Sequence, residues 1–166
     1  MPSGSDVTQR TDKQPAFSAD LLGLILRPAN ILAAWKRVRA NKGAAGIDGM
    51  SIDDFPAWAK DGNWQRIMSE LCSGQYQPSP VRRVEIDKPD GGKRQLGIPT
   101  IVDRVIQQAI AQVLTPIFDP TFSDNSFGFR PNRNGQQAVK QVQSIIKTGR
   151  RFTVDVDLSK FFDRVN

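Results

Sequence analysis

One stretch decides the fold that this sequence predicts: Arg151-Phe152-Thr153-Val154-Asp155-Val156-Asp157-Leu158-Ser159-Lys160-Phe161-Phe162-Asp163. Apolar and polar residues alternate through its first half, and side chains of a strand point alternately to its two faces. The pattern therefore predicts a β-strand with Asp155 and Asp157 together on the polar face. Two neighbouring carboxylates repel each other unless a cation lies between them, and Mg²⁺ prefers such oxygen ligands. The pair is thus either a metal site or a solvated strand face.

Composition favours a soluble globular protein with an anionic partner. Hydrophobic residues make up 39% of the 166 residues and charged residues 24%, which suits one ordinary folded domain. The formal net charge is +6 and the pI is about 9.8. This surplus favours nucleic acid first and an anionic membrane second, although solubility alone would also explain it.

Several kinds of chemistry are excluded by the residues that are missing. The chain has no histidine and a single cysteine, Cys72, which rules out an intrachain disulfide, a Cys/His zinc site and a Ser-His-Asp triad. Carboxylates, lysine or a carboxylate-bound metal remain. The first residues lack the pattern of a secretory signal, and the apolar run 21–26 is too short to span a bilayer. We therefore expect a cytoplasmic protein with no membrane partner.

Helical periodicity dominates the middle of the chain. Helices are predicted at 28–40, with Gly43 as the residue after its end, and at 64–72. The cleanest period runs from Val102 to Val113 after a cap-like Thr100/Asp103 pair, so this should be the most buried helix. A further helix should begin at Asn134 and end near Gly149, with these residues facing inward: Val139, Val142, Ile145 and Ile146.

Two basic segments are candidates for binding phosphates or bases. Residues 81–98 predict a β-hairpin with a Lys-Pro-Asp-Gly-Gly turn, and it carries Arg82, Arg83, Lys88, Lys93 and Arg94. The loop 122–133 combines three phenylalanines with two arginines: Phe122, Phe127, Phe129, Arg130 and Arg133. Aromatic rings beside arginine can stack on bases, but they can equally anchor a loop to a core. Lysines on the hairpin can likewise serve only to discourage edge pairing.

Four segments, in this order, resemble the reverse transcriptases of bacterial group II introns, which are also called maturases. They are Ala34–Val38 with Gly46–Met50, Lys88–Thr100 continuing into Asp103–Ala109, Phe122–Pro131, and Asp157–Asp163. Each motif is weak alone, but the ordered set covers most of residues 30–166. Retron-type and other bacterial reverse transcriptases share some of these blocks and remain an alternative.

The resemblance implies an α+β fold: the fingers of a right-hand polymerase, mostly helical with a short antiparallel ribbon, followed by the first palm strand. The implied division is an arm (1–28), a helical N-terminal extension (29–80), fingers (81–150) and the start of the palm (151–166). By motif match, Asp157 resembles the first metal-binding aspartate, and the Leu158 carbonyl would help to hold a metal. Asp155 lies before the motif and is the weaker candidate ligand.

Further roles follow from the same resemblance. Lys88 and Arg94 match positions that hold the incoming deoxynucleoside triphosphate, and Phe162 matches the bulky residue that excludes a ribose 2′-hydroxyl. RNA contacts are expected from Arg82, Arg83, Lys93, Arg130 and Arg133. The partners would be intron RNA, an RNA template, a DNA primer and deoxynucleotides, with Mg²⁺ as the cofactor of the complete enzyme.

One departure limits what this chain is expected to do. Such polymerases carry a later Tyr-x-Asp-Asp turn, whereas the single tyrosine here, Tyr76, precedes Gln-Pro-Ser. The chain therefore resembles an N-terminal fragment that binds Mg²⁺ weakly and does not polymerise alone. A basic RNA-binding module without catalysis is the alternative. An unpaired palm strand beside apolar Phe161 would also favour homo-oligomers.

Overall fold

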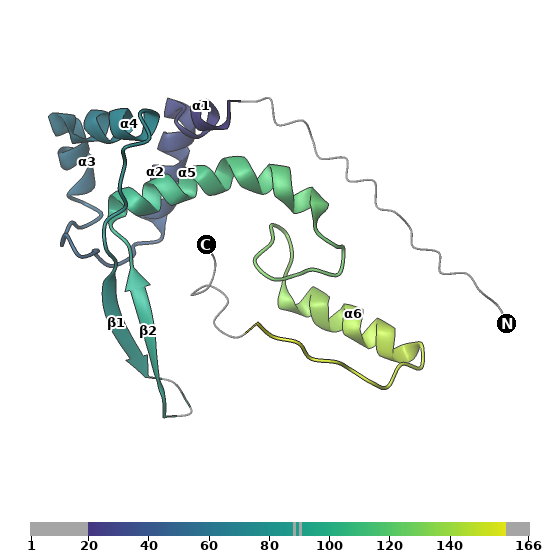
Figure 1. The fold of residues 1–166 in the computed structure, drawn as a ribbon. Coiled ribbons are helices and arrows are strands. Elements are labelled where there is room, and N and C mark those ends of the chain that lie inside the picture. Colours follow the sequence, from purple (N-terminus) through teal and green to yellow (C-terminus); the bar gives the residue numbers. More distant parts are fainter. Residues whose placement is uncertain (1–19, 88, 90, 159–166) are drawn as a thin grey trace. The chain divides into compact units, whose positions relative to one another are not determined.

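The residues that the structure describes form helices and one two-stranded antiparallel sheet, in agreement with the predicted α+β class (Figure 1). The computed structural model describes residues 20–87, 89 and 91–158. Two compact units divide the chain, residues 1–115 and 116–166, and the division falls inside the longest helix. No boundary of the four predicted segments is tested by this division, so those boundaries stay predictions.

The elements follow one another as helices, then the hairpin, then further helices. In chain order they are α1 (Leu21–Ile25), α2 (Pro28–Ala40), α3 (Phe55–Trp58), the π-helical η1 (Ala59–Asn63), α4 (Trp64–Cys72), β1 (Arg82–Asp87), β2 (Lys93–Ile98), α5 (Ile101–Phe118), the 3-10 turn η2 (Asp119–Thr121) and α6 (Gly135–Lys147). The helices predicted at 28–40 and 64–72 are confirmed with those bounds, and so is the hairpin.

Helix α5 forms the centre of the first unit, as predicted. Its residues Ile101 and Val105 are fully buried, and the core cluster extends to residues of α2, α3 and α4: Ala34, Val38, Phe55 and Ile67. The apolar positions of α5 recur every three or four residues, so they share one face of the helix. The hairpin lies between α4 and α5 in the chain, and β2 leads directly into α5 (Figure 1).

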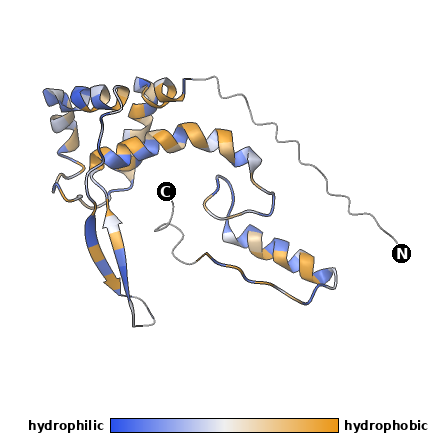
Figure 2. Cartoon of the chain, viewed as in Figure 1, coloured by the Kyte–Doolittle hydropathy of each residue, from blue (hydrophilic) through white to orange (hydrophobic). Residues whose placement is uncertain are grey.

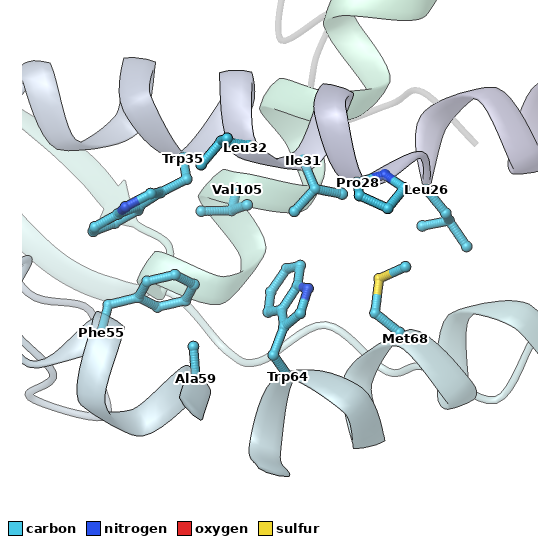
Figure 3. Close-up of a pocket in the computed structure, with 10 residues that line it drawn as sticks. All are labelled: Leu26, Pro28, Ile31, Leu32, Trp35, Phe55, Ala59, Trp64, Met68 and Val105. Carbon is cyan, nitrogen blue, oxygen red and sulfur yellow. The ribbon is translucent and has the colours of Figure 1, made fainter. Parts of the chain in front are cut away.

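An apolar cavity of about 390 Å³ opens beside this core between α2 and α4 (Figure 3). Phe55 lies with its ring centroid 4.5 Å from that of Trp35 and 5.8 Å from that of Trp64, which meets it edge-on. The lining carries no charged side chain, so the cavity offers nothing to a phosphate. Aromatic packing of this kind stabilises the contacts between α2, α3 and α4.

The start of α5 is held by a buried carboxylate. Asp103 is 4% exposed and accepts hydrogen bonds from the Thr100 hydroxyl (2.6 Å), the Tyr76 hydroxyl (2.8 Å) and the Ser79 backbone N–H (3.3 Å). Burial raises the pKa of Tyr76, and the hydrogen bond to Asp103 raises it further. The predicted Thr100/Asp103 cap is confirmed, and Asp103 also fixes the chain that leads into β1.

At the end of α2 the structure differs from the prediction that Gly43 is the residue that ends the helix. Lys42, and not Gly43, takes the left-handed conformation after the helix, with φ of +47°. Gly43 instead leaves room for Arg104, because a Cβ there would lie 2.5 Å from Nη1 of Arg104 and the end of that side chain would have to shift. The Arg104 guanidinium occupies that space and donates to the Ala44 carbonyl at 2.6 Å.

Helix α6 begins with a reciprocal cap. The Asn134 side chain accepts from the Gln137 N–H at 3.0 Å, and the Gln137 side chain accepts from the Asn134 N–H at 2.9 Å. The prediction that its apolar face lies inward is wrong, because Val139, Val142 and Ile146 are exposed and none of residues 116–158 is buried. Both polar and apolar bands are visible along α6 in Figure 2.

The strand predicted at 151–163 is not formed in the part that the structure describes. Residues 151–158 have no regular secondary structure, and their apolar side chains are exposed. A strand needs a neighbour for its backbone hydrogen bonds, and the described residues form one sheet, which contains β1 and β2 alone. Residues 159–163 lie outside the described part.

Candidate nucleic-acid interface

The β-hairpin separates its basic residues onto two faces. Cross-strand partners point to the same side of a sheet, and the register pairs Ile86 with Arg94, Val84 with Leu96, and Asp87 with Lys93. Arg82 and Arg94 therefore share a face with an exposed apolar stripe, whereas Arg83 and Lys93 share the other face with Glu85 and Asp87.

The ammonium group of Lys93 is already paired within the hairpin. Its Nζ lies 2.8 Å from Oε2 of Glu85, and both side chains are largely exposed. Such a surface pair contributes little stability, so a phosphate could displace Glu85 at small cost. Among the described residues, the structure records no ion pair for Arg82, Arg83 or Arg94, which leaves three exposed guanidinium groups for an anionic ligand. Lys88, at the turn, lies outside the described residues.

The loop 122–133 is organised around the Arg130 side chain, which is 7% exposed. Its Nε and Nη2 donate to the Asp119 carboxylate, and Nη2 also donates to the Asp119 carbonyl. Its Nη1 donates to the carbonyls of Ser123 and Ser126 at 2.8 and 3.1 Å. The hydrogen bond from Arg130 lowers the pKa of Asp119, and the same bond raises the pKa of Arg130. An RNA contact by Arg130 would require these bonds to break.

Arg133 makes fewer hydrogen bonds than Arg130 does. It donates to the Asp124 carbonyl at 2.8 Å and lies 3.4 Å from the Asp124 carboxylate, with its guanidinium over the Phe127 ring at 5.4 Å. A shallow hollow of about 530 Å³ adjoins this pair. Its lining includes two cations and three amides: Asp124, Asn125, Phe127, Arg133, Gln137, Lys140 and Gln141. Lys140 could not be selected from the sequence, where it is one polar residue among several of a predicted helix.

The acidic stretch, residues 151–163, is exposed in its described part, 151–158, which contains two carboxylates. Asp157 accepts a hydrogen bond from the Leu158 N–H at 2.8 Å, and Asp155 is likewise exposed. Carboxylate oxygens suit Mg²⁺, so the donor chemistry of the two aspartates fits that ion. Within residues 20–158, the two undescribed turn positions apart, no group of three or more potential metal ligands comes together. Phe162 lies outside the described residues.

The candidate residues therefore form separate groups. The structure brings Arg82, Arg83, Lys93 and Arg94 together on the hairpin, and Arg130 together with Arg133 in the second unit. Sequence reasoning missed Asp119 as the partner of Arg130, because eleven residues separate them and no local spacing signals the pair. Among the described residues, no helix is long and apolar enough to cross a membrane.

Comparison with known proteins identifies a domain in the second half of the chain. Residues 86–166 match the family described as reverse transcriptase (RNA-dependent DNA polymerase). That range includes part of the hairpin, the Arg130 loop and Asp157.

Named relatives extend the similarity over most of the chain. Protein YkfC of Escherichia coli (strain K12) is 37% identical over 152 residues, covering 88% of this chain and 40% of that protein. Group II intron-encoded protein LtrA of Lactococcus lactis subsp. cremoris is 37% identical over 145 residues, covering 86% and 23%. Nuclear intron maturase 1, mitochondrial, of Arabidopsis thaliana is 30% identical over 99 residues, covering 55% and 14%. The chain spans less than half the length of each.

Proposed function

The chain belongs to the reverse transcriptase family of group II introns, and from this premise we propose that it supplies the fingers and first palm strand of an RNA-directed DNA polymerase. The observation that carries the proposal is the family match over residues 86–166, which contains the acidic motif. The helical extension at 29–80, the fingers at 81–150 and the palm start at 151–166 are parts of the same proposal.

The hairpin is the proposed phosphate grip of the fingers. Arg94 has an exposed guanidinium, which can bind two oxygens of a triphosphate with its planar fork, and Lys88 in the turn would add a point charge. Arg82, Arg83 and Lys93 would contact the RNA backbone. The two hairpin faces separate these residues only in part, because Arg82 shares the apolar face with Arg94, whereas Arg83 and Lys93 lie on the polar face.

Asp157 is the proposed metal-binding carboxylate, with the Leu158 carbonyl and, less strongly, Asp155 as further oxygen ligands. When bound, two divalent ions stabilise the attacking and leaving oxygens of nucleotidyl transfer. The residues of this chain would hold and orient that site, and Phe162 would close the sugar pocket against a 2′-hydroxyl. Pairing with a neighbouring palm strand would order residues 151–158 and fix the carboxylates in place.

A second function is favoured for the chain acting alone: binding of structured RNA without catalysis. The exposed basic hairpin supports it, since phosphate contacts need only accessible cations. The sequence supplies no Tyr-x-Asp-Asp turn, so the carboxylate set for two metals is incomplete in these 166 residues.

One experiment separates the two functions. Primer extension on an RNA template, with Mg²⁺ and all four deoxynucleotides, should yield product with the complete polymerase that contains this chain and none with residues 1–166. Binding of intron RNA should be retained by residues 1–166 and should weaken steeply with salt. Extension by residues 1–166 alone would refute the claim that their metal site is incomplete. Absence of RNA binding by both proteins would refute the whole proposal.

A further inference from the structure

Phe129 is displayed to solvent in a conformation that a phenylalanine rarely adopts. Its side chain is 112% exposed, the highest value among the large hydrophobic residues of the described chain. Its φ is +55°, in the left-handed region that costs L-residues free energy. Exposure of an aromatic ring and a strained backbone are both unfavourable, and such strain is concentrated at functional sites.

The rest of the loop explains how this conformation is maintained. All five N–H donors of Arg130, the next residue, are used on Asp119, Ser123 and Ser126. Two other rings of the loop have a cation over them: Phe122 has Arg130 at 5.5 Å and Phe127 has Arg133 at 5.4 Å. No ring or cation contact is recorded for Phe129 in the described part of the chain. The loop is therefore built without using the Phe129 ring for packing.

The surroundings specify what such a ring would meet. Two residues away, Phe127 lines the hollow that also contains Arg133 and Lys140, so phosphates near this loop would find cations. A flat apolar ring beside cations matches the chemistry of an unpaired nucleobase, which stacks by its face while its phosphate is neutralised nearby. The net charge of +6 favours a polyanion over an apolar protein segment.

We propose that Phe129 stacks on an unpaired base of bound RNA, and that Arg130 positions it by holding the loop. The proposal deepens the nucleic-acid function proposed above and rests on it. It assigns to this loop a recognition of bases by stacking, independent of their sequence, in addition to the phosphate contacts of the hairpin. Arg130 is a positioning residue in this account and Phe129 is the residue that touches the ligand.

The test compares two single-stranded RNA oligomers, one of them with abasic positions in its centre, by fluorescence anisotropy with residues 1–166. Phe129→Ala should weaken binding of the normal oligomer by about fivefold to a hundredfold, the range of one lost base–aromatic stack. It should leave binding of the abasic oligomer and the salt slope unchanged, because no phosphate contact is lost. Phe129→Trp should restore the affinity.

Phe152 provides a matched control, because its ring is 98% exposed in the same unit but outside the loop. Phe152→Ala should not affect either oligomer. Equal losses from Phe152→Ala and Phe129→Ala would overturn the proposal in favour of general apolar adhesion. Unchanged binding by Phe129→Ala, or an equal loss on the abasic oligomer, would also overturn it while leaving salt-dependent RNA binding intact. Failure of the unaltered chain to bind either oligomer would overturn the underlying nucleic-acid function as well.

Discussion

The guanidinium of Arg130 binds the carboxylate of Asp119 eleven residues earlier, with Nε 2.8 Å from Oδ1. The same guanidinium satisfies two carbonyls of the loop that contains Phe129. One ion pair therefore links η2, which follows α5, to the loop that carries the exposed Phe129 ring. The predicted RNA contact of Arg130 stays a prediction, and its structural role is the one that the geometry supports.

This ion pair should make the loop sensitive to acid. The Arg130 hydrogen bond lowers the pKa of Asp119 below its usual 3.8, so the folded state binds the Asp119 proton less tightly than the unfolded state does. The stabilisation is therefore complete above about pH 4 and is lost as pH falls through the lowered pKa. The protection of residues 122–133 against amide hydrogen exchange, taken relative to the intrinsic exchange rate at each pH, should fall over that range.

An Asp119→Asn variant tests the cause. The loop of this variant should exchange faster at neutral pH and should lose the acid-dependent part of the change. Asp124→Asn is the matched control, because its carboxylate is exposed and 3.4 Å from Arg133. If the protection of the loop in the unaltered chain, relative to intrinsic exchange, does not fall in acid, the ion pair contributes nothing to loop stability.

The core of the first unit should not tolerate a charge in α5. Ile106 is 7% exposed and belongs to the core cluster, so Ile106→Asp buries a carboxylate without a partner. We expect a loss of about 3 to 5 kcal/mol, enough to unfold a domain of ordinary stability. The neighbouring Gln107 is exposed, and Gln107→Asp should change the free energy of unfolding by less than about 0.5 kcal/mol. Thermal melts followed by circular dichroism compare the two, and similar melting temperatures would contradict the placement of the core.

The hairpin should dominate the salt dependence of RNA binding. Replacing Arg94 by Gln removes one exposed cation, so the slope of log affinity against log salt should fall by about 1. Lys93→Gln should have a smaller effect on affinity, because its ammonium is paired with Glu85 in the free protein. Gln95→Ala, an uncharged change on the opposite face from Arg94, is the control. Identical slopes for all four proteins would place the phosphate contacts elsewhere.

Self-association should involve the exposed apolar face of α6. Val139, Val142 and Ile146 are more than half exposed, and an apolar helix face of this kind gains free energy when another chain covers it. Ile146→Lys should weaken association by about tenfold or more, since burial of one such side chain contributes about 1.5 to 3 kcal/mol. Light scattering over a concentration series measures this. A monomer at millimolar concentration would show that the face does not drive pairing.

Local signals predicted most of the first unit correctly. Helix α2 begins with Pro28 in its first turn and α5 with the Thr100/Asp103 pair, and in each case cap and periodicity agree within a few residues. The errors arise where the outcome depends on a distant partner. The acidic strand needs a neighbouring strand, and the inward face of α6 needs a core that residues 116–158 do not provide.

In the candidate site, too, local patterns were predictable from the sequence and contacts with distant residues were not. Spacing alone placed Arg94 and Lys93 on a hairpin, and their opposite faces follow from the two-residue period of a strand. The bond from Arg130 to Asp119 was not predictable, because a loop joins them and no periodicity relates their positions. Phe129 was selected as one of three aromatic residues, but its exposure and backbone conformation emerged only in the folded loop.

The most direct test of the central claim is primer extension by the complete polymerase containing this chain, with Asp157 changed to Asn. The substitution keeps the size of the side chain and removes the negative charge that would hold Mg²⁺. We predict that extension is abolished while affinity for intron RNA stays within about twofold, whereas Asp61→Asn, at an exposed aspartate of the first unit, leaves both unchanged. An Asp157→Asn polymerase that extends the primer at the unaltered rate would contradict the account and make the acidic stretch a solvated surface.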